Sequence, residues 1–294
     1  MILVLGKNGQ LSRALAGLLG ADARLIGRDE ADLSKPGFTQ NLTKISGGIA
    51  PRAVINAAAY TQVDKAEGEG RAEAMQVNGA AVAELAQWCK ERDIPLLHFS
   101  TDYVFDGSGR APRNEQDTTS PVNAYGQSKL VGENSLAECG GKYLLFRTSW
   151  VYDAHGKNFF NTILRLIGEK ENLKVVSDQV GAPTYAPHLA AAAVNALNNA
   201  LTVQQFPSGL YHLCGGGETS WHGFANAIFA LARTRDSGVR CQRIDPIPTT
   251  EYPLPAKRPL NSRLDCGKAK KILGVSLPDW QVGLKECFEE KYGR

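Results

Sequence analysis

Short apolar runs alternate with helical patterns through the first half of the chain. The five runs have the length of β-strands and lie at residues 2–5, 24–27, 53–58, 95–100 and 143–147. Between them, the segments 67–92 and 123–138 carry apolar residues at the spacing of an amphipathic helix. Buried strands that alternate with helices are typical of a parallel, doubly wound α/β sheet covered by helices on both faces.

The pattern changes after Trp150. The sequence predicts, in chain order, a helix over 159–169, a loop over 177–185, an Ala-rich helix over 190–200, a strand over 209–213 and a helix from Ser220. The tract 244–259 is dense in proline, which excludes one continuous helix or a central strand and favours an ordered covering loop or a sheet edge. We therefore expect a first domain at residues 1–150 and a smaller C-terminal lobe at 151–294, with some of its chain returning to the first domain.

Charge and hydropathy exclude several classes of protein. The 294 residues include 33 Lys or Arg and 30 Asp or Glu, and no dense basic run, so we expect no nucleic-acid partner. The first residues form no basic leader, and the Ala-rich stretch is interrupted by Asn195, Asn198 and Asn199. We therefore expect neither a signal peptide nor a membrane span, and a cytoplasmic protein.

Cysteine and histidine positions argue against disulfides and metal. The six cysteines are widely separated and form no paired motif, and the five histidines are scattered. We expect reduced, mostly buried thiols and no metal site.

Gly6 and Gly9 directly follow the first apolar run and precede a helical pattern that opens with Gln10 and Leu11. Glycines in this place let the backbone approach a pyrophosphate at a helix N-terminus. The pattern is G-x-x-G-x-x-S, with Ser12 where a third glycine is usual. The alternative is a plain strand-to-helix turn that needs glycine for its backbone angles. Its place after the first strand favours a dinucleotide site of the Rossmann type.

The end of the second apolar run carries both signs of charge. Asp29 or Asp32 can accept a hydrogen bond from a ribose hydroxyl, and Arg28 can pair with a 2′-phosphate. Because both are present, the sequence does not separate NADH from NADPH. Arg28 is equally consistent with a solvated surface charge.

The third apolar run ends in small side chains, Ala57, Ala58 and Ala59. Small residues at the carboxyl end of a strand allow a flat ligand to lie against the backbone. Taken alone, the alanines also fit simple tight packing.

Tyr125 and Lys129 are four residues apart on a predicted helix, so both project from one face. A tyrosine hydroxyl is a weak acid near neutral pH, and a neighbouring ammonium lowers its pKa. The same ammonium can donate to the nicotinamide ribose. Ser100 or Thr101 offers a hydroxyl that polarises a substrate carbonyl. With the glycine turn, this set predicts an oxidoreductase; the alternative is an ordinary surface helix pair.

Longer motifs resemble those of a known family. They are N-A-A-A-Y-T-Q-V-D-K-A-E from Asn56, S-T-D-Y-V-F-D-G from Ser100, F-R-T-S-W-V-Y from Phe146, D-Q-V-G-A-P-T from Asp178, G-L-Y-H-L from Gly209 and R-P-L-N-S-R-L from Arg258. Over nearly the whole chain they resemble the extended short-chain dehydrogenases and, within them, the dTDP-4-dehydrorhamnose reductases. The resemblance implies NAD(P)H-dependent reduction of the C4 keto group of a dTDP-sugar substrate, the last step of dTDP-rhamnose synthesis.

The resemblance also implies roles for individual residues. Tyr125 is the catalytic acid or base, assisted by Lys129 and Thr101, and Lys129 also binds the cofactor. Thr101, Asp102 and Trp150 meet the sugar or its nucleotide. The expected dinucleotide contacts are Gly6, Gly9, Gln10, Leu11, Arg28, Asp29, Asp32, Leu33, Ala59, Tyr60, Thr61 and Phe99.

One departure from the family concerns metal. Some members dimerise around magnesium held by glutamates, where this chain has Ala14 and, near the second place, Pro187. Neither residue binds a hard cation. We therefore expect no metal, and a monomer or a weak homodimer.

The substrate's diphosphate needs a cation of its own, and Arg258 or Arg263 is expected to supply it because arginine suits phosphate oxygens. The alternative is that these residues pair with the neighbouring lobe. Two other functions stay open: a sister reductase that makes another 6-deoxyhexose, and a non-catalytic regulatory subunit on the same fold. The intact Tyr125, Lys129 and Thr101 favour catalysis.

Overall fold

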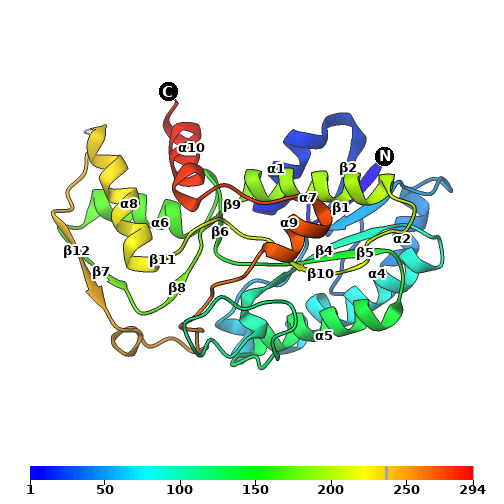
Figure 1. Cartoon of the computed structure of the whole chain (residues 1–294), viewed down its shortest axis with the longest axis horizontal. Coiled ribbons are helices and arrows are strands. Elements are labelled where there is room, and N and C mark those ends of the chain that lie inside the picture. The colour runs from blue at the N-terminus through cyan, green and yellow to red at the C-terminus, as the bar shows by residue number, and fades with distance from the viewer. Residues whose placement is uncertain (236–237, 294) are drawn as a thin grey trace.

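Figure 1 shows the computed structural model of the protein, which describes residues 1–235 and 238–293. A six-stranded sheet in the order β10-β5-β4-β3-β1-β2 lies at its centre, and all neighbouring strands are parallel. The strands are β1 (Ile2–Leu5), β2 (Ala23–Ile26), β3 (Ala53–Asn56), β4 (Leu96–Thr101), β5 (Tyr143–Thr148) and β10 (Gly209–His212). The predicted doubly wound α/β fold of the Rossmann type is confirmed.

Alternation along the strands separates two cores. Leu3 and Leu5 of β1 point to one face of the sheet, and Ile2 and Val4 point to the other. The helices on the first face are α2 (Thr39–Ile45), α3 (Arg71–Met75), α4 (Ala81–Lys90) and α5 (Ala124–Cys139). The helices on the second face are α1 (Gln10–Leu19), α7 (Ala186–Thr202) and α9 (Gly267–Leu273). In Figure 1, α1 and α7 lie above the sheet and α4 and α5 below it.

The sheet has a switch point between β1 and β3. The chain passes from β1 outward to β2 and then returns to β3 on the other side of β1. Connections therefore leave the carboxyl ends of β1 and β3 in opposite directions, which opens a crevice between them. This is the place at which doubly wound sheets bind ligands.

A π-helical turn over Gln76–Ala80 joins α3 to α4. It turns Asn78 inward, where its side chain contacts both the backbone amide (2.9 Å) and the carbonyl (3.0 Å) of Tyr60. The side-chain nitrogen of Asn78 also donates to the Ser128 hydroxyl of α5 at 2.9 Å. Asn78 thus fixes the loop after β3 against α5, and π-helical turns are frequent at such functional positions.

A second lobe packs around its own apolar cluster. Its helices are α6 (Phe159–Glu169), α8 (Trp221–Thr234) and α10 (Trp280–Tyr292), and its strand pairs are β7 (Asn172–Val176) with β12 (Arg243–Ile247), β6 (Val151–Tyr152) with β9 (Thr184–Tyr185), and β8 (Val180–Gly181) with β11 (Thr219–Ser220). Residues after Trp150 are therefore divided between the lobes, because α7, β10 and α9 belong to the core of the central sheet.

The second half contains more strand than the sequence pattern predicts. The segment 177–185, expected as a loop, includes β8 and β9. The proline-dense tract begins within β12, which pairs with β7 and carries Pro246 opposite Val175. Proline fits here because the strand lies in a two-stranded sheet with an open edge. Among the described residues, no helix combines the length and the apolar character that crossing a membrane requires.

Candidate active site

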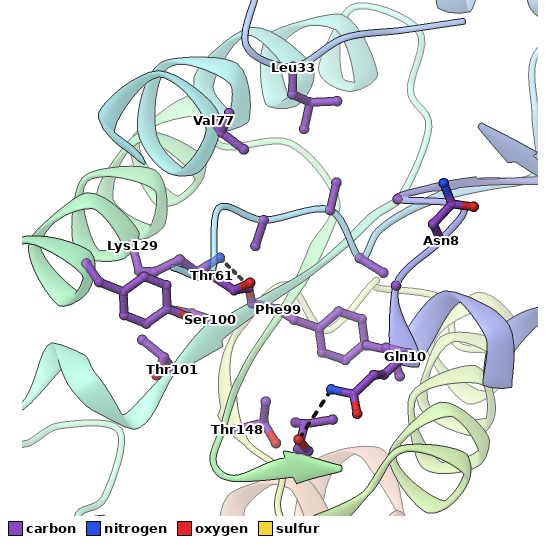
Figure 2. Close-up of a pocket in the computed structure, with 18 of the residues that line it drawn as sticks. Asn8, Gln10, Leu33, Thr61, Val77, Phe99, Ser100, Thr101, Lys129 and Thr148 are labelled. Carbon is purple, nitrogen blue, oxygen red and sulfur yellow. Dashed lines mark hydrogen bonds between the residues drawn. The ribbon is translucent and has the colours of Figure 1, made fainter. Parts of the chain in front are cut away.

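A cavity of about 880 Å³ lies at the switch point, bordered by the carboxyl ends of the sheet strands. Figure 2 shows Leu33 and Val77 on one side of it and Asn8 and Gln10 on another. Fifteen of the residues that the sequence singled out line this cavity: Gly6, Gly9, Gln10, Leu11, Arg28, Asp32, Leu33, Ala59, Thr61, Phe99, Thr101, Asp102, Tyr125, Lys129 and Trp150. Residues far apart in sequence thus meet where the fold binds ligands.

The turn between β1 and α1 has the form required for a close approach to a ligand. Gly6 adopts φ +98°, and a Cβ there would lie 2.8 Å from the backbone nitrogen of Ala58. Gly9 precedes α1 and leaves its first turn without a side-chain cap or an acidic residue. The amides at the start of α1 are therefore free to meet an anion. Ser12 is fully buried and its hydroxyl bonds to the Leu5 carbonyl at 3.5 Å, so serine fits in place of the third glycine.

Charged residues gather at the end of β2. The Arg28 side chain is 70% exposed and pairs only loosely with Glu73, at 3.3 Å. Asp32 accepts from the Ser34 amide at 3.0 Å and from its hydroxyl at 2.8 Å, and these bonds hold the pKa of Asp32 below its usual value. Both Arg28 and Asp32 border the cavity, so the geometry leaves either coenzyme possible.

Two expected dinucleotide contacts lie outside the cavity lining. Asp29 is exposed, and its carboxylate folds back over Gly27. Tyr60 is 4% exposed, and its backbone is held by Asn78 while its neighbours Ala59 and Thr61 border the cavity. The direct contact implied for these two residues stays a prediction.

Tyr125 and Lys129 lie on the first two turns of α5. Asn123 caps this helix by accepting from the Gly126 amide at 2.7 Å. Gly126 is required there because a Cβ would meet the Tyr103 carbonyl at 2.1 Å. The cap and this close contact fix the start of α5, so that both functional side chains project into the cavity.

The Lys129 side chain is bound by the backbone of β4. Its ammonium donates to the Phe99 carbonyl at 2.6 Å, and Figure 2 shows its side chain near Phe99 and Thr61. Burial lowers the pKa of Lys129 to about 8, although the charge of Glu133 raises it in part. The lysine therefore keeps most of its charge at neutral pH.

The electrostatics of Tyr125 differ from the sequence-based expectation. Burial raises the pKa of Tyr125 above its ordinary value and the charge of Asp102 raises it further, while the Thr101 hydroxyl lowers it. The predicted lowering by Lys129 is not seen, and the ammonium donates instead to the Phe99 carbonyl. Tyr125 is consequently protonated near neutral pH and is placed to act as an acid.

Buried hydroxyl and carboxyl groups face the cavity without partners. The Thr101 hydroxyl donates to Asp102 at 3.1 Å, but the other Asp102 oxygen and the hydroxyls of Ser100 and Thr148 have no hydrogen-bond partner among the described residues. Burial raises the pKa of Asp102 to about 6. Unpaired polar atoms at a cavity wall are typical of groups that bind a ligand. Thr148 was not expected from the sequence, where it was only part of a longer motif.

A tryptophan pair joins the two lobes at the edge of the cavity. Trp150 adopts φ +50°, which non-glycine residues rarely do, and its ring stacks on Trp221 of α8 at 3.7 Å. Backbone strain of this kind is common at functional sites. Trp221 was not predicted, because nothing in the sequence links it to a residue 71 positions earlier.

A second cavity of about 660 Å³ adjoins the first, and Tyr103 and Trp221 border both. Its wall includes the aromatic rings of Phe159 and Tyr252 and the cation Arg258. Arg258 also makes two 2.7 Å contacts with the Asp64 carboxylate.

Arg263 pairs with Glu218 of the second lobe. Arg258 and Arg263 thus both pair with carboxylates, as expected if they join the two lobes. Their role as diphosphate anchors stays a prediction. Within residues 1–235 and 238–293, no group of three or more His, Cys, Asp or Glu side chains is arranged to hold a metal ion.

Comparison with known proteins assigns this arrangement to a family. The family model described as RmlD substrate binding domain matches residues 1–292. The dTDP-4-dehydrorhamnose reductase of Burkholderia thailandensis is 47% identical over 98% of each chain. The chain belongs to the dTDP-4-dehydrorhamnose reductase family. The Escherichia coli member is 41% identical over 99% of this chain and 98% of its own.

Solved structures agree with this membership. The dTDP-4-dehydrorhamnose reductase of Bacillus anthracis, solved in complex with NADP, superposes with a TM-score of 0.88 at 31% identity over 98% of each chain. UDP-glucose 4-epimerase of Brucella ovis, at 19% identity and a TM-score of 0.79, shares the fold alone. The resemblance that the sequence motifs indicated is therefore confirmed.

Proposed function

We propose that this chain reduces the C4 keto group of dTDP-4-dehydro-L-rhamnose to dTDP-L-rhamnose at the expense of NADPH or NADH. The observation that carries the proposal is the meeting of Tyr125, Lys129 and Thr101 in one cavity with the glycine turn of β1 and α1. Binding alone does not require a protonated, buried tyrosine beside a charged lysine. Membership of the reductase family supports the same activity.

The residues at the switch point fit a nicotinamide dinucleotide. Gly6, Gly9 and the uncapped start of α1 would hold the pyrophosphate, and Arg28 and Asp32 would meet the adenine ribose. Lys129 would donate to the nicotinamide ribose. When bound, the reduced dinucleotide supplies the hydride that the keto carbon accepts.

Tyr125 supplies the proton. Its hydroxyl is protonated at neutral pH because burial and Asp102 raise its pKa, so Tyr125 Oη donates to the C4 oxygen as that oxygen gains charge. Thr101 lies at the end of β4 in the same cavity; its hydroxyl donates to Asp102, and it would turn from Asp102 to donate to the C4 oxygen. Lys129 is not among the groups that shift the pKa of Tyr125, so its part in the reaction would be to bind the cofactor.

The second cavity suits the nucleotide half of the substrate. Its walls combine aromatic rings, which can stack on a base, with Lys174, Lys257 and Arg258, which can meet a diphosphate. Tyr103 and Trp221 border both cavities, so a sugar joined to this nucleotide would reach the Tyr125 hydroxyl. The cofactor and the nucleotide sugar would thus occupy adjoining cavities.

We also propose that the protein works as a monomer or weak homodimer in the cytoplasm. The location in the cytoplasm is supported by the six cysteines, which are all free thiols, four of them buried. Thiols of this kind are typical of a reducing compartment.

Product analysis tests the proposed reaction. The protein is incubated with dTDP-4-dehydro-L-rhamnose and NADPH or NADH, and the proton couplings at C4 of the product are read by NMR. We expect the rhamno configuration, and no product with the matched Tyr125→Phe variant. The opposite configuration at C4 would identify a sister reductase, and an unchanged substrate would favour a non-catalytic role.

A further inference from the structure

His98 lies directly beneath the functional lysine. It occupies the middle of β4 and is 1% exposed. Its Nε2 atom is 3.4 Å from Lys129 Nζ, the same ammonium that donates to the Phe99 carbonyl at 2.6 Å. Two neighbouring residues of one strand therefore bind two of the three ammonium protons, and one proton is left for the cavity that Lys129 borders.

The contact fixes the protonation of the imidazole ring. An ammonium has no lone pair, so Nε2 must accept and the ring proton must lie on Nδ1. Burial and the charge of Lys129 lower the pKa of His98 well below its usual value, so the ring stays neutral. Nδ1 makes no hydrogen bond of regular geometry among the described residues, although the backbone of Asn56 beside it raises the pKa of His98 in part.

A neutral acceptor has a specific consequence for Lys129. The nearest carboxylate on α5 is Glu133, and it is committed to Arg147 through contacts of 2.6 to 3.2 Å, with both side chains 4% exposed. The ammonium is thus held by a ring nitrogen and a carbonyl, neither of which carries a charge. Its positive charge remains available to a ligand in the cavity.

We propose that His98 is a positioning residue that selects the conformation of Lys129 and aims its remaining proton at the cofactor ribose. The inference rests on the proposed function in so far as the cavity binds NAD(P)H. His98 itself touches neither the cavity nor the reacting atoms, since it is absent from the cavity lining.

Two matched variants separate positioning from packing. Glutamine places an amide oxygen close to where the ring has Nε2, whereas asparagine reaches only the position of Nδ1. We expect His98→Asn to weaken NADPH binding about tenfold, as loss of a hydrogen bond to a charged group does, and His98→Gln to stay within about threefold of the wild type. The readout is the cofactor dissociation constant measured by calorimetry without sugar, with melting temperatures as the control for folding.

A double-mutant cycle tests whether His98 acts through the lysine. In a Lys129→Met background, His98→Asn should cause no further loss of NADPH affinity. Equal dissociation constants for the Asn and Gln variants, or an undiminished effect in the Lys129→Met background, would overturn the proposal.

A measurement on the folded wild type removes dependence on the variants. Histidine labelled with ¹⁵N should report an imidazole protonated at Nδ1, with an Nε2 resonance that shifts in Lys129→Met. A ring protonated at Nε2 would contradict the proposal. If the wild type bound NADPH but did not reduce the sugar, the proposed function would fail and the positioning role would stand.

Discussion

Burial acts on Tyr125 and Lys129 in opposite senses. It raises the pKa of the phenol and lowers the pKa of the ammonium, because in each case the charged form is disfavoured. Both groups are therefore protonated near neutral pH, which is the state that a reductase needs before the proton moves. The pH range in which both groups are protonated ends near the pKa of Lys129, about 8.

Removal of the proton donor should abolish turnover with little effect on binding. Tyr125→Phe keeps the ring and loses only the hydroxyl, so we expect kcat to fall about 10²–10⁴-fold with an unchanged cofactor dissociation constant. Steady-state kinetics and calorimetry on the same preparation measure both quantities. Activity within threefold of the wild type would remove Tyr125 from the mechanism.

The pH profile should report the lysine. Lys129 is charged below its pKa of about 8 and neutral above it, so kcat/KM should fall as the pH rises through this value. The pKa of Tyr125 is raised above its ordinary value, so the tyrosine cannot cause this fall. Lys129→Arg keeps a charge at all relevant pH values and should remove the basic limb from any activity it retains. A wild-type profile that stays flat across this range would contradict the assignment.

Sequence spacing was sufficient to predict that Tyr125 and Lys129 share a helix face. It could not predict that the ammonium turns toward Phe99, or that His98 lies beneath it, because these contacts span about thirty residues between a strand and a helix. The direction of the Tyr125 pKa shift was missed for the same reason, since burial is a property of the folded chain.

The turn from β1 to α1 shows how an element's geometry depends on one residue. Gly6 combines φ +98° with a 2.8 Å approach to Ala58, so a methyl group has neither the backbone angle nor the space it needs. We expect Gly6→Ala to destabilise the protein and to weaken cofactor binding at least tenfold.

Gly17→Ala provides the matched control for this turn. Gly17 lies within α1 and a Cβ there would meet nothing within 4 Å, so the substitution should leave binding unchanged and raise stability slightly. Thermal melts and NADPH titrations of both variants give the comparison. Equal cofactor affinity in the two variants would exclude the turn as a binding element.

Helices and sheet strands were predictable where the apolar pattern was long enough to show a period. The helix over 159–169 was predicted with the bounds of α6, and all five early strands were found. The two-residue strands β6, β8, β9 and β11 and the π-helical turn have no such pattern. Their positions depend on tertiary contacts, for example the bonds from Asn78 to Tyr60.

At the scale of the whole molecule, two lobes enclose adjoining cavities, and Arg258 makes a contact between the lobes. It pairs with Asp64, which follows β3 in the first lobe, and it also borders the second cavity. A pair separated by 194 residues cannot be derived from sequence spacing, so the choice between anchor and interlobe contact was open there.

Two substitutions distinguish an anchor from an interlobe contact. If Arg258 binds the diphosphate, Arg258→Ala should lower kcat/KM for the sugar and leave NADPH binding unchanged. The expected fall corresponds to a loss of about 1.5–3 kcal/mol of transition-state stabilisation. Asp64→Asn removes the pair but keeps Arg258, so it should retain kcat/KM within about threefold. Equal losses in the two variants would show that the pair matters only for joining the lobes.

The most direct test of the proposed reductase follows NAD(P)H absorbance with the purified wild-type protein. We expect oxidation that requires dTDP-4-dehydro-L-rhamnose and consumes one reduced coenzyme per sugar. No oxidation is expected with dTDP-glucose, which has no keto group. Failure of the keto sugar to cause oxidation with either coenzyme, in protein shown to bind that coenzyme, would contradict the assignment.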